Sequence, residues 1–265
     1  MPEIVHIASR QNPLVKEVQK LRAKPAYRRQ QGVFLAEGHK LCADAADAGA
    51  HILWAVCSDQ AQQRYPEACR LVLSAAARSY TATDEVFLKL SGQKAPQGVL
   101  CGVAEQSVLA PLDQLDVNRS YLLLEQVSDP GNVGTILRTA AALGLGGILL
   151  DSGCADCLGD KAVRASMGSI FKLPVYRVDS APDTVAWLKR QGLPVYGSTL
   201  SCRSVDIGQV DLRAPCAVVI GNEGRGITEP TAAACDQLVH IPITPAAESL
   251  NAAAAAAIFS WEMMR

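Results

Sequence analysis

The chain has 265 residues, of which 49% are hydrophobic and 19% are charged, and its formal net charge is -1. This composition excludes a disordered protein and predicts a globular one with a good core, divided into two domains of ordinary size. The near-neutral charge gives no overall attraction to nucleic acid, so such binding would depend on a local basic surface.

The chain shows no feature of a membrane or secreted protein. No apolar run approaches the ~20 residues that cross a bilayer, and residues 1–6 lack a signal-peptide pattern, so we expect a cytoplasmic protein. Nine scattered cysteines are typical of a reduced protein rather than of a disulfide framework. Cys154 and Cys157 form a lone CxxC without a nearby histidine, so we predict no metal site.

The first thirty residues are locally basic, with seven basic residues against two acidic ones. Apolar residues recur at helical spacing over 12–24, which predicts a basic amphipathic helix that Pro25 ends. Charge alone fits a solvated helix face and a phosphate-binding surface about equally.

Strands and helices are predicted to alternate from residue 32 onward. The predicted strands are 33–38, 52–56, 71–73 and 98–103, and the predicted helices are 39–48, a glutamine- and alanine-rich segment after 56, and 84–90. This alternation predicts a compact α/β domain over 1–104. Residues 105–120 are polar and interrupted by Pro111, so we interpret them as a linker.

A second α/β domain is predicted over 121–265. It opens with the continuous apolar run 121–125, which is typical of a strand buried on both faces. Further strands are predicted at 147–150, 175–178, 195–199, 217–220 and 238–243. Helical stretches separate them, which predicts a parallel sheet covered on both faces.

Two polar residues stand out in the helix predicted after Pro130. Asn132 occupies the position expected of a helix cap, and Arg138 lies off the apolar stripe. Taken alone, the first could serve only as a cap and the second only as a solvated arginine.

The densest polar region follows the last two predicted strands. Residues 221–226 read GNEGRG, and their three glycines let the backbone approach a ligand closely. Pro242 ends the last strand because it has no N-H to donate. The segment ESLN at 248–251 then precedes an alanine-rich helix that we expect to start near Ser249 or Asn251. Two strand ends and a helix start therefore predict a ligand pocket, although the glycines alone would also fit a tight turn.

Three blocks now stand in order: PGNVG at 130–134 with RTA at 138–140, IGNEGRG at 220–226, and IPI at 241–243 with ESLN at 248–251. Together they resemble the three motifs of the SpoU (TrmH) family of RNA ribose 2'-O-methyltransferases, which belong to the SPOUT class. The resemblance implies a homodimer with S-adenosyl-L-methionine (AdoMet) as its cofactor. It also implies a deep trefoil knot, which simple connection rules would not predict.

The resemblance covers 121–265 and extends more weakly to the first domain. FLAEG at 34–38 and PQG at 96–98 are similar to the L30e-like substrate-binding domain that many members carry. The implied fold is α/β: a C-terminal parallel-sheet SPOUT domain preceded by a smaller L30e-like domain.

The resemblance also assigns the cofactor site. Contacts to AdoMet, largely through backbone atoms, fall on Gly221, Ile241 and Leu250, with Thr199, Leu200 and Ile243 lining the same cleft. We expect glycine at 221 because a side chain there would block the adenosine. Pro245 stands where relatives often have glycine, which could change the shape of that loop without removing a functional group.

The catalytic positions implied by the resemblance are Asn132, Arg138, Glu223, Ser249 and Asn251. A free arginine has a pKa above ~12 and is a poor general base, so we assign Arg138 the role of a forked donor that binds the target phosphate. Glu223 could hold either Arg138 or a backbone amide. All of these polar positions are intact, so we expect an active enzyme.

The basic N-terminal region acquires a role from the resemblance. Its candidate RNA contacts are Arg10, Lys16, Lys20, Arg22, Arg28 and Arg29. Phosphate contacts position RNA without reading its sequence, and such binding weakens as salt rises. An aromatic content of 5% does not indicate extensive base stacking.

We therefore predict AdoMet-dependent methylation of a ribose 2'-hydroxyl in structured RNA. The separate first domain favours 23S-type ribosomal RNA, and transfer RNA is the alternative target. A dinucleotide-dependent oxidoreductase is disfavoured because the glycine loop lacks the expected fingerprint and acidic residue. An RNA-binding protein without catalysis would be expected to show losses among the catalytic positions.

Overall fold

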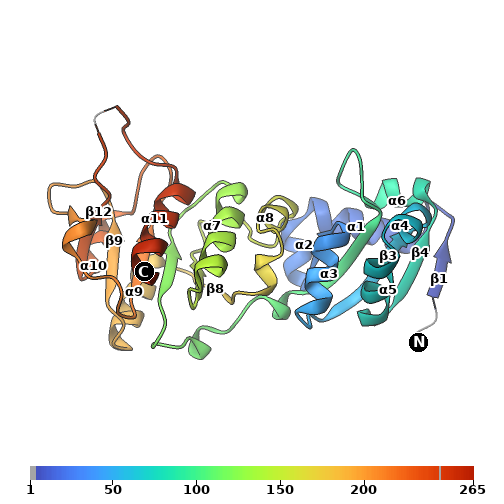
Figure 1. The fold of residues 1–265 in the computed structure, drawn as a ribbon, viewed down its shortest axis with the longest axis horizontal. Coiled ribbons are helices and arrows are strands. Elements are labelled where there is room, and N and C mark those ends of the chain that lie inside the picture. Colours follow the sequence, from blue (N-terminus) through green and yellow to red (C-terminus); the bar gives the residue numbers. More distant parts are fainter. Residues whose placement is uncertain (1–3, 245) are drawn as a thin grey trace. The chain divides into compact units, whose positions relative to one another are not determined.

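The computed structural model describes residues 4–244 and 246–265, which form two compact units (Figure 1). Unit 1 comprises Met1–Val108 together with Leu158–Phe171, and unit 2 comprises Leu109–Cys157 together with Lys172–Arg265. The predicted division assigned all of 121–265 to the second domain, whereas 158–171 packs within unit 1. It is held there in part by Phe171, whose ring stacks on Phe34 at 6.0 Å between centroids.

Unit 1 is built on a five-stranded mixed sheet with strand order β1-β4-β3-β5-β2. Its strands are β1 (Ile4–Ile7), β2 (Val33–Glu37), β3 (Ile52–Ser58), β4 (Ser79–Ala82) and β5 (Val99–Ala104). Its α-helices are α1 (Pro13–Ala23), α2 (Pro25–Gln31), α3 (His39–Asp47), α4 (Asp59–Arg64), α5 (Pro66–Ala75), α6 (Asp84–Leu90) and α8 (Asp160–Ala165). Strand β5 runs antiparallel to both of its neighbours, and β4 runs parallel to both of its own.

Several predicted elements of unit 1 are confirmed and one is wrong. Helix α1 ends before Pro25 as predicted, but Pro25 also begins α2, where a missing N-H costs nothing at the first helical position. Residues 71–73, predicted as a strand, lie in α5, which buries Val72 and Leu73 on one face. Strands β1 and β4 were not predicted because four residues with little apolar alternation give too weak a pattern.

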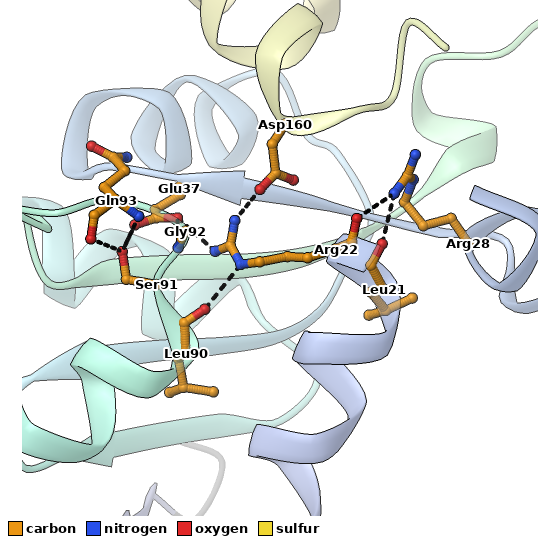
Figure 2. A network of polar contacts seen from close by, with 9 residues as sticks. All are labelled: Leu21, Arg22, Arg28, Glu37, Leu90, Ser91, Gly92, Gln93 and Asp160. Atoms are coloured by element: carbon orange, nitrogen blue, oxygen red, sulfur yellow. Dashed lines mark hydrogen bonds and ion pairs between the residues drawn. The ribbon is translucent and has the colours of Figure 1, made fainter. Parts of the chain in front are cut away.

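Arg28 lies inside unit 1, contrary to its predicted place on an RNA-binding surface. Its side chain is 6% exposed, and its guanidinium donates to the carbonyls of Leu21 (2.7 Å) and Arg22 (3.1 Å) at the end of α1 (Figure 2). A cation is favourable there because the last carbonyls of a helix lack intrahelical donors. Arg28 therefore stabilises the turn between α1 and α2.

Arg22 is also committed to the fold. Its guanidinium donates to the carbonyl of Leu90 at 3.0 Å and forms ion pairs with Glu37 (2.5 Å) and Asp160 (Figure 2). Of the other predicted RNA contacts, Lys16, Lys20 and Arg29 are exposed, and Arg10 forms an exposed ion pair with Glu85. The basic surface is thus smaller than the sequence suggests.

Unit 2 is built on a seven-stranded, wholly parallel sheet with strand order β10-β12-β9-β11-β6-β7-β8. Its strands are β6 (Tyr121–Leu124), β7 (Gly147–Leu150), β8 (Val175–Arg177), β9 (Val195–Ser198), β10 (Val205–Asp206), β11 (Ala217–Ile220) and β12 (Gln237–His240). Its α-helices are α7 (Pro130–Leu143), α9 (Ala181–Arg190), α10 (Glu229–Ala234) and α11 (Ala252–Met264). A strand is found at each of the six predicted places, although the last ends at His240 and not at the predicted 243. Strand β10 was missed because two residues carry no pattern.

Short 3-10 helices complete the description. They are Glu105–Ser107, Leu112–Gln114, Ser169–Phe171 and Ile207–Gln209.

No α-helix of the described residues is long and apolar enough to cross a bilayer. The α/β class is confirmed, whereas the trefoil knot implied by the resemblance stays a prediction.

The N-termini of α7 and α11 position polar side chains of the candidate site. Asn251 caps α11 as predicted, accepting from the backbone N-H groups of Ala253 (2.9 Å) and Ala254 (3.4 Å). The predicted cap of α7 is wrong, because Asp129 caps that helix and Pro130 takes its first position. Asn132 therefore lies inside the first turn, where its side chain is available for other partners.

Candidate active site

A cavity of about 500 Å³ opens in unit 2 where β9, β11 and β12 end and α11 begins. The carboxyl ends of parallel strands meet at one edge of a sheet, which is the usual place for a ligand in such a fold. All six predicted cofactor contacts line this cavity: Thr199, Leu200, Gly221, Ile241, Ile243 and Leu250. Glu223 and Ser249 line it as well.

Asn222 organises the glycine loop that forms one wall of the cavity. Its backbone exchanges two hydrogen bonds with Gly226, at 3.0 and 2.9 Å, and its side-chain oxygen accepts from the N-H groups of Gly224 and Arg225. Its side-chain amide donates to the carbonyl of Gln126 at 2.9 Å. The sequence placed Asn222 among the polar residues around the predicted pocket without giving it a role, and an Asn between glycines is a signal for such a turn.

The reason that position 221 is glycine differs from the predicted one. A Cβ atom at Gly221 would stand 2.1 Å from the carbonyl carbon of Gly226 and 2.3 Å from the nitrogen of Ile227. Glycine is therefore required by the loop's own close approach, before any ligand is considered. The predicted placement of Gly221 at the cavity holds, but its predicted clash with adenosine is not needed to explain the residue.

Glu125 anchors the end of this loop that leads into α10. It directly follows β6, is 2% exposed, and accepts from the N-H of Thr228 (2.8 Å), the hydroxyl of Thr228 (2.7 Å) and the hydroxyl of Thr231 (2.6 Å). Thr228 caps α10, so Glu125 fixes the point where the loop enters that helix. In the sequence, Glu125 is a carboxylate at the end of an apolar run. A carboxylate is buried at such a place only when it has hydrogen-bond partners, so this position was the signal for a polar contact.

Three of the predicted catalytic side chains form a chain of hydrogen bonds. The amide of Asn251 donates to the side-chain oxygen of Asn132 at 3.1 Å, and the amide of Asn132 donates to Glu223 at 2.8 Å. The second oxygen of Glu223 accepts from the N-H and hydroxyl of Ser128 at 3.5 and 3.4 Å. These contacts bring together α7, the glycine loop and the start of α11.

The surroundings of Glu223 favour its charged form. Partial burial by itself raises the pKa of this carboxyl, but hydrogen bonds from Asn132 and from the backbone N-H groups of Glu223, Ser128 and Asp129 together lower the pKa below its ordinary value. Glu223 therefore carries a negative charge at neutral pH and is a weak proton acceptor.

Arg138 does not line the cavity of its own chain. It is exposed on α7 and has no ion pair or hydrogen bond among the residues that the structure describes. Arg138 is six positions after Asn132, which amounts to about 9 Å along the axis and a different side of the helix. Glu223 pairs with Asn132 rather than with Arg138, so one of the two predicted alternatives for Glu223 is not found.

The remaining features of the site concern Pro245 and metals. Pro245 lies outside the described residues. Within the described ranges, no group of three His, Cys, Asp or Glu side chains is arranged to hold a metal ion. Burial raises the pKa of the Cys157 thiol to about 12, so that thiol stays protonated.

Comparisons with known proteins agree with this architecture. Residues 119–261 match the SpoU rRNA Methylase family, and residues 12–101 match the MRM3-like substrate binding domain. The chain is 33% identical to an uncharacterized tRNA/rRNA methyltransferase of Synechocystis sp., over 99% of this chain and 94% of that protein. It is 31% identical to the 23S rRNA (guanosine(2553)-2'-O)-methyltransferase RlmP of Bacillus subtilis, over 97% of this chain and 98% of that protein.

A solved structure is similar over nearly the whole chain. The AdoMet-bound rRNA methyltransferase from Sinorhizobium meliloti superposes with a TM-score of 0.87 at 30% identity, covering 98% of this chain and 97% of that one. The match includes both units, so the similarity is not confined to the methyltransferase half.

Proposed function

The chain belongs to the SpoU rRNA methylase family, and from that premise we propose that it transfers the methyl group of AdoMet to a ribose 2'-hydroxyl of 23S-type ribosomal RNA. One observation carries this proposal: all six residues assigned to the cofactor from the motifs line a single cavity at the carboxyl ends of parallel strands. Relatives that are named as 23S rRNA 2'-O-methyltransferases support the choice of substrate.

The cavity suits AdoMet in size and in lining. About 500 Å³ lies within the usual range for small-molecule sites of ~300 to 1,000 Å³. Backbone groups at 221, 241 and 250 offer hydrogen bonds, while Leu200 and Ile243 offer apolar surface. AdoMet supplies a methyl group on a positively charged sulfur, and the ionised carboxylate of Glu223 at the cavity wall complements that charge.

We assign Glu223, Asn132 and Asn251 to positioning rather than to proton transfer. The lowered pKa of Glu223 makes it a poor base, and one of its oxygens is already occupied by Asn132. The chain of hydrogen bonds holds the start of α7 beside the start of α11, where Ser249 is exposed at the cavity. Of the five predicted catalytic residues, Ser249 both is exposed and lines the cavity, so we propose that it contacts the substrate.

A homodimer would complete the site with Arg138. Helix α7 packs against α11, and the exposed side chains of the two helices include Arg138, Ala142, Ile258 and Trp261. Trp261 is 57% exposed, which is unusual for a side chain of that size unless it meets a partner. We propose that this face is a two-fold interface that carries Arg138 to the cavity of the partner subunit, where its guanidinium binds the target phosphate.

Calorimetry and methyl-transfer assays test the activity. We expect the purified chain to bind AdoMet but not NAD, and to transfer labelled methyl groups from AdoMet to a 23S rRNA transcript more than to transfer RNA. Binding of NAD without any heat from AdoMet would end the proposal. Transfer to transfer RNA alone would keep the chemistry and change the substrate.

Mixing two inactive variants tests the origin of Arg138. Arg138→Ala should keep AdoMet affinity within about twofold and lower methyl transfer about a hundredfold or more. Gly221→Trp should abolish AdoMet binding because the loop has no room for a side chain. If Arg138 acts across the interface, a mixture of the two variants regains activity, since one intact cavity meets one intact arginine. If the mixture stays inactive although heterodimers form, Arg138 acts within its own chain.

The exposed basic residues of unit 1 remain candidates for phosphate contacts. Lys16, Lys20 and Arg29 are exposed, so we retain them and leave out Arg22 and Arg28. Such contacts should show as a salt-dependent affinity that does not depend on RNA sequence.

We place the protein in the cytoplasm. Ribosomal RNA is its proposed substrate, and all nine of its cysteines are free thiols, which suits a reducing compartment.

A further inference from the structure

Two rings stack face to face at the surface of unit 1. His39 begins α3 and Tyr65 stands between α4 and α5, and their ring centroids are 3.8 Å apart with 4° between the planes. Both residues are half-buried, so the stack is neither part of the core nor fully solvated. The guanidinium carbon of exposed Arg64 lies 5.3 Å from the centroid of the Tyr65 ring.

The backbone holds this stack in place. A nitrogen of the His39 ring, Nδ1, donates to the side-chain oxygen of Gln97 at 3.0 Å, because that oxygen can only accept. Gly38 and Gly98, which flank these two residues, have φ values of 116° and 80°. The N-H of Gly38 also donates to the carbonyl of Val99 at 2.9 Å, so the two segments are fixed to each other.

Three basic residues next to the stack in the sequence form no ion pair within the part of the chain that the structure describes. Lys40, Arg64 and Lys94 are exposed and form no ion pair among the residues that the structure describes, and within the same residues the hydroxyl of Tyr65 makes no hydrogen bond. Lys40 follows His39 directly, and Lys94 stands in the same loop as Gln97. The half-buried stack is thus accompanied by Arg64 over the Tyr65 ring and by two exposed lysines close to it in the sequence.

The other aromatic and basic pair of unit 1 is different. Lys20 lies 5.7 Å from the ring centroid of Tyr27, but the hydroxyl of Tyr27 donates to Glu17 at 2.7 Å. Hydrogen bonding to Glu17, with some burial, raises the pKa of Tyr27, so this ring is already engaged with a carboxylate of its own unit. Charge can attract RNA there, but no comparable stack of rings is offered.

We infer that the stacked surface, defined as His39, Lys40, Arg64, Tyr65, Lys94 and Gln97, binds unpaired nucleotides of the RNA substrate. An unpaired base stacks on a ring or guanidinium plane, and the lysines contact the adjoining phosphates. Paired RNA keeps its bases stacked within the helix and cannot use such a surface. The choice of RNA as ligand rests on the proposed function, whereas the stack itself is a property of unit 1.

Paired substitutions separate stacking from charge and from folding. The probes are a short unstructured RNA labelled with fluorescein and the same strand annealed to its complement, bound to the full chain. We expect Tyr65→Leu and His39→Leu to weaken binding of the unpaired RNA about tenfold, and Tyr65→Phe and His39→Phe to stay within about twofold of the parent chain. Binding of the duplex should not change in any of the four. As the control, Lys20→Ala should weaken both RNAs alike, because it removes only a charge.

The inference is overturned if the Leu and Phe variants bind the unpaired RNA equally. Melting midpoints identify any Leu variant that has lost stability, and in that case Arg64→Ala with Lys94→Ala decides, since both side chains are exposed. If the parent chain does not methylate 23S rRNA, the proposed function is contradicted, but the comparison of RNA binding between the variants still tests the stacked surface. Conversely, normal methylation with an unchanged KM for RNA in the Leu variants contradicts the stacked surface alone.

Discussion

Each unit contains a buried glutamate at the end of a strand, and the two are held in opposite ways. Glu37 ends β2 of unit 1 and is 8% exposed, while Glu125 follows β6 of unit 2 and is 2% exposed. Glu37 meets a charged partner, Arg22, along with Ser91 and the N-H of Gly92 (Figure 2). Glu125 accepts from two threonine hydroxyls and one backbone N-H, and it has no cationic partner among the residues that the structure describes.

The difference shows what each carboxylate does for its unit. Arg22 also pairs with Asp160, so the charged network of Glu37 ties segment 158–171 into unit 1. The neutral network of Glu125 instead fixes one end of the glycine loop at the cavity. Loss of Glu37 leaves Arg22, whose side chain is 15% exposed, with Asp160 as its one remaining carboxylate among the described residues. Loss of Glu125 leaves only neutral donors without partners, which costs less.

The largest expected effect follows from Glu37→Ala. Removing one partner of a buried ion pair costs about 3–5 kcal/mol, so we expect the free energy of unfolding of unit 1 to fall by about that amount. Urea unfolding followed by the fluorescence of Trp54, which is buried in unit 1, measures it in a background without Trp187 and Trp261. The control Glu85→Ala removes an exposed partner of Arg10 and should cost less than about 1 kcal/mol. Equal losses would remove the distinction between the buried and the exposed pair.

Glu125→Gln should have a smaller effect on stability and a visible one on the cavity. The amide keeps the size but places a donor against donors, so we expect a loss of about 1–3 kcal/mol in unit 2. Because the glycine loop loosens, AdoMet affinity should fall about tenfold, as measured by calorimetry. The matched control is Glu229→Gln, which changes an exposed carboxylate on α10 paired with Arg203 and should leave affinity unchanged. A stable Glu125→Gln chain with full affinity would show that the loop needs no anchor.

Glu223 is a third carboxylate near a strand end, and we expect its contribution to the free energy of unfolding to depend on pH. Its pKa is lower in the folded chain, so it contributes stability above the ordinary glutamate pKa of 4.5, and this contribution is lost as pH falls through the folded value. We expect the stability difference between the parent chain and Glu223→Gln to be constant from neutral pH down to 4.5 and to shrink below it. Urea midpoints at a series of pH values measure this difference. A difference that grows on acidification would mean that the pKa of Glu223 is raised instead.

The smallest expected effect concerns the backbone beneath Asn222. Gln126 has φ of 55° without being glycine, and only its carbonyl contacts Asn222. Gln126→Gly should therefore increase the free energy of unfolding by about 0.5–1 kcal/mol, seen as a slightly higher melting midpoint. It should not change AdoMet affinity. Gln126→Val should lower stability by more than about 1 kcal/mol, because a β-branched residue tolerates this conformation poorly. If both variants behave alike, strain at this position is not significant.

Much of the fold could be predicted because its strands are buried on both faces. Runs such as those of β6, β7 and β11 are continuous and apolar, and such runs signal a parallel sheet. The failures were at β1, β4 and β10, where two to four residues gain their strand conformation from neighbours rather than from a pattern of their own. The residues 71–73 failed for a related reason, since three apolar residues in a row fit a helix face equally well.

The candidate site divides in the same way. The six cofactor positions could be assigned because motif residues sit at strand ends, and parallel strands bring those ends together. Glu125 and Gln126 were not predicted, and Asn222 was placed at the pocket without a role, because the roles of all three depend on contacts between segments far apart in the chain. Arg22 and Arg28 were misjudged because a basic residue on an amphipathic helix looks the same in sequence whether it faces solvent or a buried carbonyl.

The sequence pattern of apolar, small and capping residues was enough to determine where most elements of this protein begin and end. Hydrogen bonding and burial along one strand or helix depend on residues that are neighbours in the sequence. Only the tertiary structure decided which polar groups meet. It brought together Asn132 and Glu223, which form a hydrogen bond, Thr228 and Glu125, which form another, and the stacked rings of His39 and Tyr65. Directional contacts form between side chains brought together by folding, and their partners lie tens of residues away, beyond the reach of any local pattern.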